Sequence, residues 1–256
     1  MSSSTEEVQT SNISTIGYVV HDANQPFTLE SITLKEMQPT ELLIEMQYSG
    51  ICHTDLVFQK GQIRVCPYPA ILGHEVFGLG TVGLTAIMAA KYLKVKQIIG
   101  VDIFDHKLPL AKELGCTDVL NSSGLSADDI VKKIKELTGK NNGADFAIDC
   151  TGVPKVIEAM LNVLSMRGTA ATVGVPPTGA KIEIDPLQYL LGSRGYKGCR
   201  EGDSNPPVFI PQLCKMQADG HFPVEKLCKV YDYKDLDKAL HDLHDGKVTK
   251  PVIKWS

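Results

Sequence analysis

Long apolar runs are absent from this sequence of 256 residues, and none approaches the roughly eighteen residues that a membrane-spanning helix needs. An excess of basic charge is absent too, because 26 Lys and Arg face 30 Asp and Glu and the formal net charge is −4. Such a surface has no general attraction for nucleic acid or anionic lipid. The N-terminus lacks the basic start and apolar core of a secretion signal. We therefore expect a cytoplasmic protein that binds neither membrane nor nucleic acid.

Paired cysteine motifs are also missing. The seven cysteines are odd in number, widely dispersed and include no CxxC pair, which argues against a disulfide framework. Internal repeats and low-complexity tracts are absent as well. What remains is ordinary for a soluble globular protein, with 43% hydrophobic and 22% charged residues. The length allows one large domain or two smaller ones.

The first third of the chain predicts a modest β-rich region. Short apolar runs between turn residues indicate strands at 16–20, 27–29 and 41–48, and in the last of these Leu42, Ile44 and Met46 alternate with their neighbours. Residues 49–68 are rich in polar and turn residues and predict a loop with a short helix. Residues 1–15 are polar and predict a disordered lead-in.

From Ile71 onward, strand and helix patterns alternate, which predicts a parallel sheet with right-handed crossovers. The strands are expected at 76–79, 97–101, 118–120, 145–149 and 169–173, with a further candidate at 181–184. The helices are expected at 81–92, 106–114, 126–137 and 154–164. The tail predicts two more helices, at 207–218 and 233–244, and a final strand at 251–255.

A glycine-rich loop opens the first helix of this alternating region. Gly78, Gly80 and Gly83 match G-x-G-x-x-G, which permits a tight turn and lets a pyrophosphate approach the helix N-terminus. Asp102 ends the next predicted strand, nineteen residues after Gly83 (102 − 83), where an acid would bind the ribose hydroxyls of NAD and repel a 2′-phosphate. The alternative is a tight turn followed by a solvated aspartate. We favour a Rossmann-type unit that holds NAD(H).

Two shorter motifs lie upstream of the glycine loop. Cys52 lies in G-I-C-H-T-D and His74 in G-H-E, and both residue types are good zinc ligands. Their spacing alone is also compatible with a half-buried thiol and a surface imidazole. A catalytic zinc needs three protein ligands and an open position, where it stabilises an alkoxide during hydride transfer.

Taken together, the G-I-C-H-T-D, G-H-E, V-F-G-L-G-T-V-G-L and I-I-G-V-D segments resemble the zinc-dependent medium-chain alcohol dehydrogenases. Residues 196–204 and 247–253 resemble the C-terminal part of that family, most closely the aryl- or benzyl-alcohol type. The resemblance implies a GroES-like catalytic region before the Rossmann unit. It implies that Cys52 and His74 bind catalytic zinc, that Glu75 tunes the metal, that Thr54 passes the alcohol proton and that Asp55 orients a ligand histidine. The cofactor contacts that we predict are His53, Gly78, Gly80, Thr81, Val82, Gly83, Asp102, Lys107 and Lys250.

The chain departs from the resembled family immediately after Glu75. The family continues there with the rest of the catalytic domain, including a structural zinc lobe of four cysteines and the third catalytic zinc ligand, whereas Glu75 here runs directly into the glycine loop. We interpret the join as an internal deletion, from alternative splicing or the choice of gene model. Zinc held by two ligands is bound weakly or not at all. Apolar faces and strand edges near residues 16–48 should also be left exposed.

The sequence thus predicts an α/β fold in which a truncated GroES-like region (16–73) precedes a Rossmann domain (74–205), while residues 206–256 complete both. The expected function is hydride transfer between a primary, aromatic-type alcohol and NAD, impaired by the missing zinc ligands. The alternative is a non-catalytic NAD(H)-binding module, or a truncated form that associates with a full-length sibling. The expected partners are a small alcohol or aldehyde and a second copy or sibling of the chain.

Overall fold

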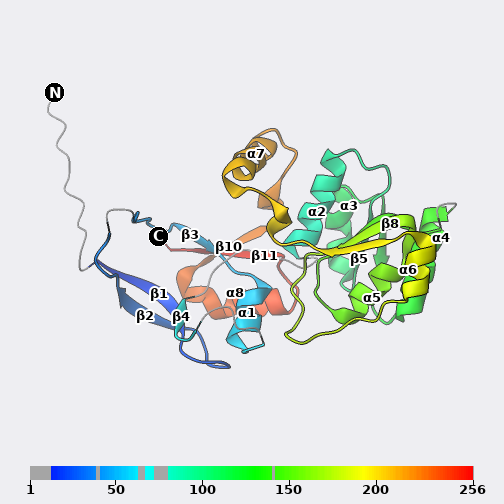
Figure 1. Cartoon of the computed structure of the whole chain (residues 1–256). Coiled ribbons are helices and arrows are strands. Elements are labelled where there is room, and N and C mark those ends of the chain that lie inside the picture. Colours follow the sequence, from blue (N-terminus) through cyan, green and yellow to red (C-terminus); the bar gives the residue numbers. More distant parts are fainter. Residues whose placement is uncertain (1–12, 39–40, 63–66, 72–79, 140–141, 256) are drawn as a thin grey trace.

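Figure 1 shows the computed structural model of the chain, which describes residues 13–38, 41–62, 67–71, 80–139 and 142–255. The N-terminal strands lie at one end of the molecule and the alternating strands and helices at the other. Among the helices of the described residues, none combines the length and the apolar composition that crossing a membrane requires. The helices are α1 (His53–Gln59), α2 (Thr81–Tyr92), α3 (Leu108–Leu114), α4 (Ala127–Thr138), α5 (Pro154–Asn162), α6 (Pro186–Gly192), α7 (Pro206–Ala218) and α8 (Leu236–His244).

The N-terminal sheet has three strands in the order β2-β1-β4. Strands β1 (Ser14–Val20) and β2 (Thr28–Thr33) pair antiparallel, and the short β4 (Ala70–Ile71) pairs with the end of β1. The predicted strands at 16–20 and 27–29 are confirmed, and β1 begins two residues before its predicted start, within the predicted lead-in. Val20 is fully buried where β1 meets β4, so this end of the sheet joins the core.

A second sheet joins the two ends of the chain. Strand β11 (Lys250–Lys254) pairs parallel with β10 (Cys228–Asp232) and antiparallel with β3 (Tyr48–Gly50). Helix α8 packs on this sheet, and Ile51, Tyr231, Leu236, Ala239, Val248 and Ile253 form its buried cluster. The C-terminal strands therefore complete the N-terminal part of the fold.

The predicted strand at 41–48 is wrong over most of its length, because only Tyr48 belongs to a strand. Residues 42–46 make no backbone hydrogen bond to another described residue. Leu42 is 87% exposed and Ile44 is 70% exposed, so alternate apolar side chains face solvent. Alternation supplies the composition of a strand, but a strand also needs a neighbour with which its backbone can pair. The expected exposure of apolar surface in this region is confirmed.

We expect Ile44→Lys to change the free energy of unfolding by less than about 0.5 kcal/mol, because the side chain is exposed and packs on little. The lysine should also reduce self-association at high concentration, since a charge on an apolar strand-like segment opposes edge-to-edge pairing. Urea unfolding and light scattering over a concentration series measure the two effects. Ile157→Lys is the control, because Ile157 is buried and its substitution should unfold the chain. A large loss of stability in Ile44→Lys would contradict the expectation.

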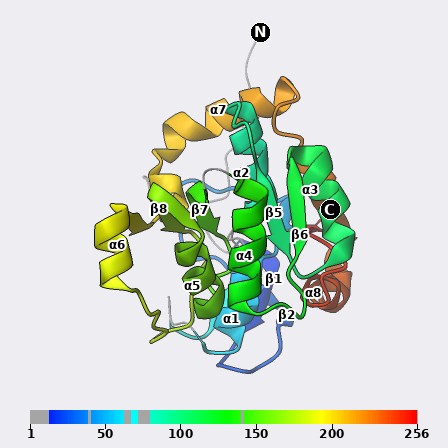
Figure 2. The same cartoon turned by 90° about the vertical axis from the view of Figure 1, so that its right-hand side faces the viewer.

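The rest of the chain alternates strands and helices. Strands β5 (Ile99–Asp102) and β6 (Asp118–Asn121) pair parallel, and β7 (Ala144–Asp149), β8 (Leu164–Thr172) and β9 (Gly195–Gly198) form a second parallel set. Figure 2 shows α3 beside β5 and β6, and α5 beside β7 and β8. The predicted parallel pairing is thus confirmed, whereas the candidate strand at 181–184 is wrong. The strand predicted at 76–79 lies outside the described residues.

Local sequence signals place several helix ends as expected. Ser126 caps α4, its hydroxyl accepting from the Asp129 backbone N–H at 3.1 Å while the Asp129 carboxylate accepts from the Ser126 N–H, which is a capping box. Gly115 ends α3 with a φ of 144°. Two apolar clusters form the core of this part of the fold, one at α2 and α3 around Leu84, Met88 and Leu114, and one at α5 and β8 around Ile157, Leu161 and Leu164.

An ionic cluster in which Asp242 and Tyr231 are buried and Lys238 is exposed ties α8 to β10. The Tyr231 hydroxyl donates to Asp242 Oδ2 at 2.9 Å, and Lys238 Nζ lies 2.6 Å from the same oxygen. These hydrogen bonds, that from Lys238 first, lower the pKa of Asp242 to about 2. Burial, together with the adjacent carboxylate, raises the pKa of Tyr231 to about 12. The cluster is therefore stable as a phenol facing a carboxylate.

This cluster should make stability depend on acid pH. An unfolded aspartate has a pKa of about 3.9, so the stabilisation by Asp242 is complete above pH 4 and is lost as the pH falls towards 2. Urea midpoints should fall more steeply between pH 4 and 2.5 for the wild type than for Asp242→Asn. Exposed Asp237 lies on the same helix, and Asp237→Asn should keep the wild-type slope. Equal acid slopes in the wild type, Asp242→Asn and Asp237→Asn would refute the assignment.

At pH 7, Tyr231→Phe should lower the free energy of unfolding by about 1.5 kcal/mol, since a hydrogen bond to a charged group is lost.

Candidate functional site

Helix α2 begins where the glycine loop predicts. Gly80 precedes the helix without a side-chain cap, and Thr81, Val82 and Gly83 are buried in its first turn. The first backbone N–H groups of an α-helix have no intrahelical acceptor, and Gly80 has no Cβ to shield them. The start of α2 therefore has the chemistry of an anion site. Gly78 lies outside the described residues.

The end of β5 forms a hollow with α2. Asp102 and Lys107, both predicted cofactor residues, line this hollow on one side, and Leu84 and Ile87 of α2 line it on the other. Asp102 Oδ1 accepts the Phe104 backbone N–H at 2.9 Å, which fixes the carboxylate at the end of the strand. The hollow measures about 10 Å³, which is room for about one water molecule, so it is a narrow gap beside Asp102 and Lys107 and not a preformed ribose pocket.

Cys52 and Asp55 lie together at the start of α1. Cys52 is buried, and its backbone N–H donates to Asp55 Oδ2 at 3.0 Å. An acid at the third helical position that accepts from the residue before the helix is half of a capping box, so Asp55 organises this turn whatever else it contacts. The backbone turn aligns the two predicted zinc-site residues at the N-terminus of one helix.

Lys250 connects this turn to the glycine helix. Its side chain is buried, at 4% exposure for the residue, and Nζ donates to the Ile51 carbonyl at 3.2 Å, next to Cys52. The preceding carbonyl, that of Thr249, accepts the Thr81 hydroxyl at 3.4 Å. A continuous series of contacts therefore runs from the Cys52 turn through β11 to the first turn of α2.

Several predicted residues cannot be placed. His74 and Glu75 lie outside the described residues, as does Cys66, and the side chains of His53 and Thr54 are not described. Within the described part of the chain, no three His, Cys, Asp or Glu residues are grouped so that they could hold a metal ion. The described residues supply Cys52 with neighbouring Asp55, which does not by itself make a zinc site.

Two other cysteines are excluded as nucleophiles by their surroundings. Burial raises the pKa of Cys150 to about 12 and that of Cys116 to about 11, so both are neutral thiols at physiological pH. Asp149, next to Cys150, accepts from the backbone N–H groups of Thr151 and Gly152 at 2.8 and 3.1 Å. The Asp149 carboxylate thus acts in hydrogen bonding at the end of β7.

The backbone segments that follow β7 and β8 pass very close to each other. A Cβ added to Gly152 would lie 2.3 Å from the Val175 carbonyl oxygen, and one added to Gly174 would lie 2.3 Å from the Gly152 backbone nitrogen. The backbone N–H groups of Val173 and Gly174 both donate to the Asp149 carbonyl. Only glycine fits at this crossing, which lies at the edge of the sheet where Rossmann folds bind ligands.

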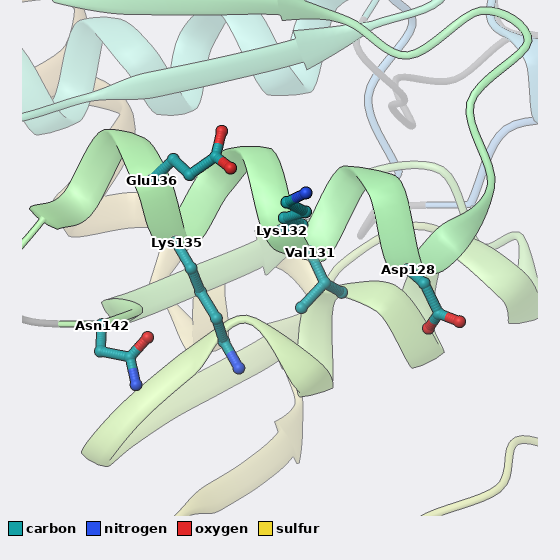
Figure 3. A pocket seen from close by; sticks show the side chains of 6 residues that line it. All are labelled: Asp128, Val131, Lys132, Lys135, Glu136 and Asn142. Carbon is teal, nitrogen blue, oxygen red and sulfur yellow. The ribbon is translucent and has the colours of Figure 1, made fainter.

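A shallow hollow on the outer face of α4 contains none of the predicted site residues. Figure 3 shows five of its side chains spaced along α4, with acids and lysines interspersed, and a sixth, Asn142, beyond the end of the helix; the five are Asp128, Val131, Lys132, Lys135 and Glu136. Its mixed charge is typical of a solvated helix face. His241 on α8 is similarly exposed and lies 3.2 Å from Asp245.

Sequence reasoning missed three residues beside the Asp102 hollow. Phe104 and His106 contact Gly246, which follows α8 more than a hundred residues later in the chain. The weak signal was the position of Phe104 between Asp102 and Lys107. No local pattern indicates that a turn near the C-terminus would lie against it.

Two family profiles match the sequence. The profile described as "Alcohol dehydrogenase GroES-like domain" matches residues 38–83, and the one described as "Zinc-binding dehydrogenase" matches residues 81–214. The two matches overlap at residues 81–83, so no further catalytic-domain sequence lies between them.

Similar proteins include several dehydrogenases. Geraniol dehydrogenase of Castellaniella defragrans is 32% identical over 178 residues, which are 70% of this chain and 47% of that protein. S-(hydroxymethyl)glutathione dehydrogenase of Saccharomyces cerevisiae is 33% identical over 183 residues, again 70% of this chain and 47% of that protein. The chain therefore spans about half the length of the curated relatives it matches.

Solved structures show the same fold. Benzyl alcohol dehydrogenase from Acinetobacter calcoaceticus superimposes with a TM-score of 0.88 at 24% identity, covering 95% of this chain and 100% of that one. The predicted α/β fold, Rossmann-type with a GroES-like N-terminal region, is thus confirmed. The zinc-binding dehydrogenase match, residues 81–214 of 256, covers more than half of the sequence. The chain belongs to the zinc-dependent alcohol dehydrogenase family that its motifs resemble.

Proposed function

We propose that this chain binds NAD(H), and that the reaction it inherits is hydride transfer between a primary, aromatic-type alcohol and NAD. The observation that carries the proposal is the position of Asp102 at the end of β5, close to Lys107 and to Leu84 and Ile87 of the glycine helix α2. A carboxylate there suits the ribose hydroxyls of NAD and repels the 2′-phosphate of NADP. The bound dinucleotide supplies the hydride acceptor.

The cofactor roles follow from charge and position. Backbone N–H groups after Gly78 and Gly80 would bind the pyrophosphate, helped by the partial positive charge of the α2 N-terminus. Lys250 and His53 are proposed to contact the same phosphates. Support for Lys250 comes from its place between the Cys52 turn and the glycine helix.

The zinc roles remain proposals drawn from the family. Cys52 and His74 would bind the metal, with Glu75 nearby, and zinc in such a site supplies a Lewis acid for the alcohol oxygen. Thr54 would pass the alcohol proton and Asp55 would orient a ligand histidine. Because the third ligand and the four-cysteine lobe are absent from the sequence, we expect weak zinc binding and impaired turnover.

A second candidate is a non-catalytic NAD(H)-binding module that pairs with its own copy or with a longer sibling. The adjoining family matches favour it, since the GroES-like match ends where the dehydrogenase match begins. Under either candidate we divide the chain into a lead-in (1–15), a partial GroES-like region (16–73), a Rossmann domain (74–205) and a C-terminal segment (206–256). The pairing of β11 with β3 and β10 supports the role of that last segment.

Three measurements on the purified chain test the proposal. NADH titration by fluorescence should show saturable binding that is tighter than that of NADPH. Elemental analysis should show less than one zinc per chain, and benzyl alcohol with NAD should give little or no NADH. Binding with zinc and turnover would assign the enzyme, whereas binding without turnover would assign the module. Absence of NADH binding would refute both.

A further inference from the structure

The loop after β5 packs against the turn that ends α8. This β5 loop, residues 103–107, places His106 Nε2 2.7 Å from the Gly246 carbonyl oxygen. The Phe104 ring lies against Gly246 itself, where an added Cβ would stand 3.1 Å from Cε2 and 3.2 Å from Cζ. The Phe104 and His106 rings also contact each other, with centroids 5.5 Å apart. The loop is therefore fixed to a distant part of the chain by a ring contact and a hydrogen bond.

Phe104 also contacts both charged residues of the Asp102 hollow. Its backbone N–H donates to Asp102 Oδ1 at 2.9 Å, and Lys107 Nζ lies 4.8 Å from the centroid of its ring. A cation at this distance is attracted to the ring face. The ring of Phe104 is thus coupled to Lys107, and its backbone to the Asp102 carboxylate.

The turn at Gly246 is a tight helix end that requires glycine. Its N–H donates to the Leu243 carbonyl at 3.0 Å and the Lys247 N–H donates to the Asp242 carbonyl at 2.8 Å, which is a Schellman motif with φ of 70° at Gly246. Three residues on, the Thr249 carbonyl accepts the Thr81 hydroxyl of α2. One short segment thus contacts both the β5 loop and the glycine helix.

We propose that Phe104 is a positioning residue for the adenosine half of the dinucleotide. Seated on the Gly246 turn, its ring holds Asp102 and Lys107 in the orientation that binds the adenosine ribose and its adjoining phosphate. A site whose side chains are held in place before binding loses less conformational entropy when the ligand arrives. The inference rests on the proposed NAD(H) binding and adds the C-terminal turn as the element that sets its affinity.

The chain offers a matched control for testing this contact. Gly220 ends α7 in the same Schellman geometry, with φ of 76° and with its N–H and that of His221 bonded to the Gln217 and Met216 carbonyls. A Cβ at Gly220, however, meets no described atom within 4 Å. Gly246→Ala and Gly220→Ala therefore impose similar backbone strain, and only the first displaces the Phe104 ring.

The experiment measures ADP-ribose affinity by calorimetry in the full chain. We expect Gly246→Ala to bind about tenfold more weakly than the wild type and Gly220→Ala to bind within twofold, while both variants show similar urea midpoints. Phe104→Ala should weaken binding as well. Because no ring remains to be displaced, adding Gly246→Ala to Phe104→Ala should cause little further loss.

Three results would overturn the inference while leaving the proposed function intact. The first two are equal ADP-ribose affinity in Gly246→Ala and Gly220→Ala, and wild-type affinity in Phe104→Ala. Additive losses in the double variant would also overturn it, since they would show that Gly246 acts independently of the ring. A wild-type chain that binds no ADP-ribose would instead refute the proposed function, and the inference with it.

Discussion

Gly152→Ala should lower the free energy of unfolding by about 4 kcal/mol, most of the margin that a domain of this size has. The new Cβ would lie 2.3 Å from the Val175 carbonyl oxygen, 2.4 Å from the Val175 carbonyl carbon and 2.8 Å from the Pro176 nitrogen. All three are backbone atoms, which cannot rotate away as a side chain can. The φ of 68° adds strain that glycine alone avoids.

The Gly152→Ala substitution should also weaken hydrogen bonds at the edge of the sheet. Separating the two backbones would pull Val173 and Gly174 from the Asp149 carbonyl, and would strain the hydrogen bond from the Gly152 N–H to the Asp149 carboxylate. Urea unfolding followed by far-UV circular dichroism measures the loss. Gly124→Ala is the control, because Gly124 has φ of 72° and a Cβ there meets no described atom within 4 Å, so about 1 kcal/mol is expected. Equal losses in the two variants would show that strain in φ, and not the backbone crossing, dominates.

Helix positions could be predicted where a residue type, such as a capping serine or a loop glycine, acts within a single turn of the helix. The last glycine of the loop and the apolar spacing after it placed α2 at 81–92, and Ser126 with Asp129 placed the start of α4. Such signals depend on hydrogen bonds that form within one turn of the helix. They do not depend on where the rest of the chain lies.

The strand prediction failed where a segment forms a strand only if a neighbouring strand is present to pair with it. Residues 41–47 have the alternation of a half-buried strand, yet residues 42–46 pair with no described backbone and their apolar side chains are exposed. Residues 41–48 lie within the GroES-like profile match, which ends at residue 83, where the dehydrogenase match has already begun. An alternating pattern indicates which residues could face a core, but it does not supply that core.

The same distinction between local signals and long-range contacts applies to the residues of the candidate site. Asp102 was predictable because its distance from the glycine loop reflects the length of one strand–helix–strand unit. The seat of Phe104 on Gly246 joins residues more than a hundred positions apart, and no periodicity in either segment encodes it. Lys250 was carried over from the family, and its burial beside Ile51 emerges only from the antiparallel pairing of β11 with β3.

Asp102→Asn should weaken NADH binding about 30-fold, which corresponds to about 2 kcal/mol for hydrogen bonds to a lost carboxylate charge. Asparagine is the informative replacement because its carbonyl oxygen can still accept the Phe104 N–H at the end of β5. The loop should therefore keep its conformation while losing its negative charge. NADPH, whose 2′-phosphate the carboxylate repels, should lose much less affinity or gain some.

The ratio of NADPH to NADH affinity is therefore the decisive quantity, since a general disturbance of the loop would weaken both cofactors alike. Asp105→Asn removes the same charge three residues away, on a side chain that does not line the hollow. It should leave that ratio unchanged, which separates a direct ribose contact from the local field. Fluorescence titration of both cofactors against the three proteins gives the answer. If Asp102→Asn bound NADH as tightly as the wild type, the hollow between β5 and α2 would not be the ribose site.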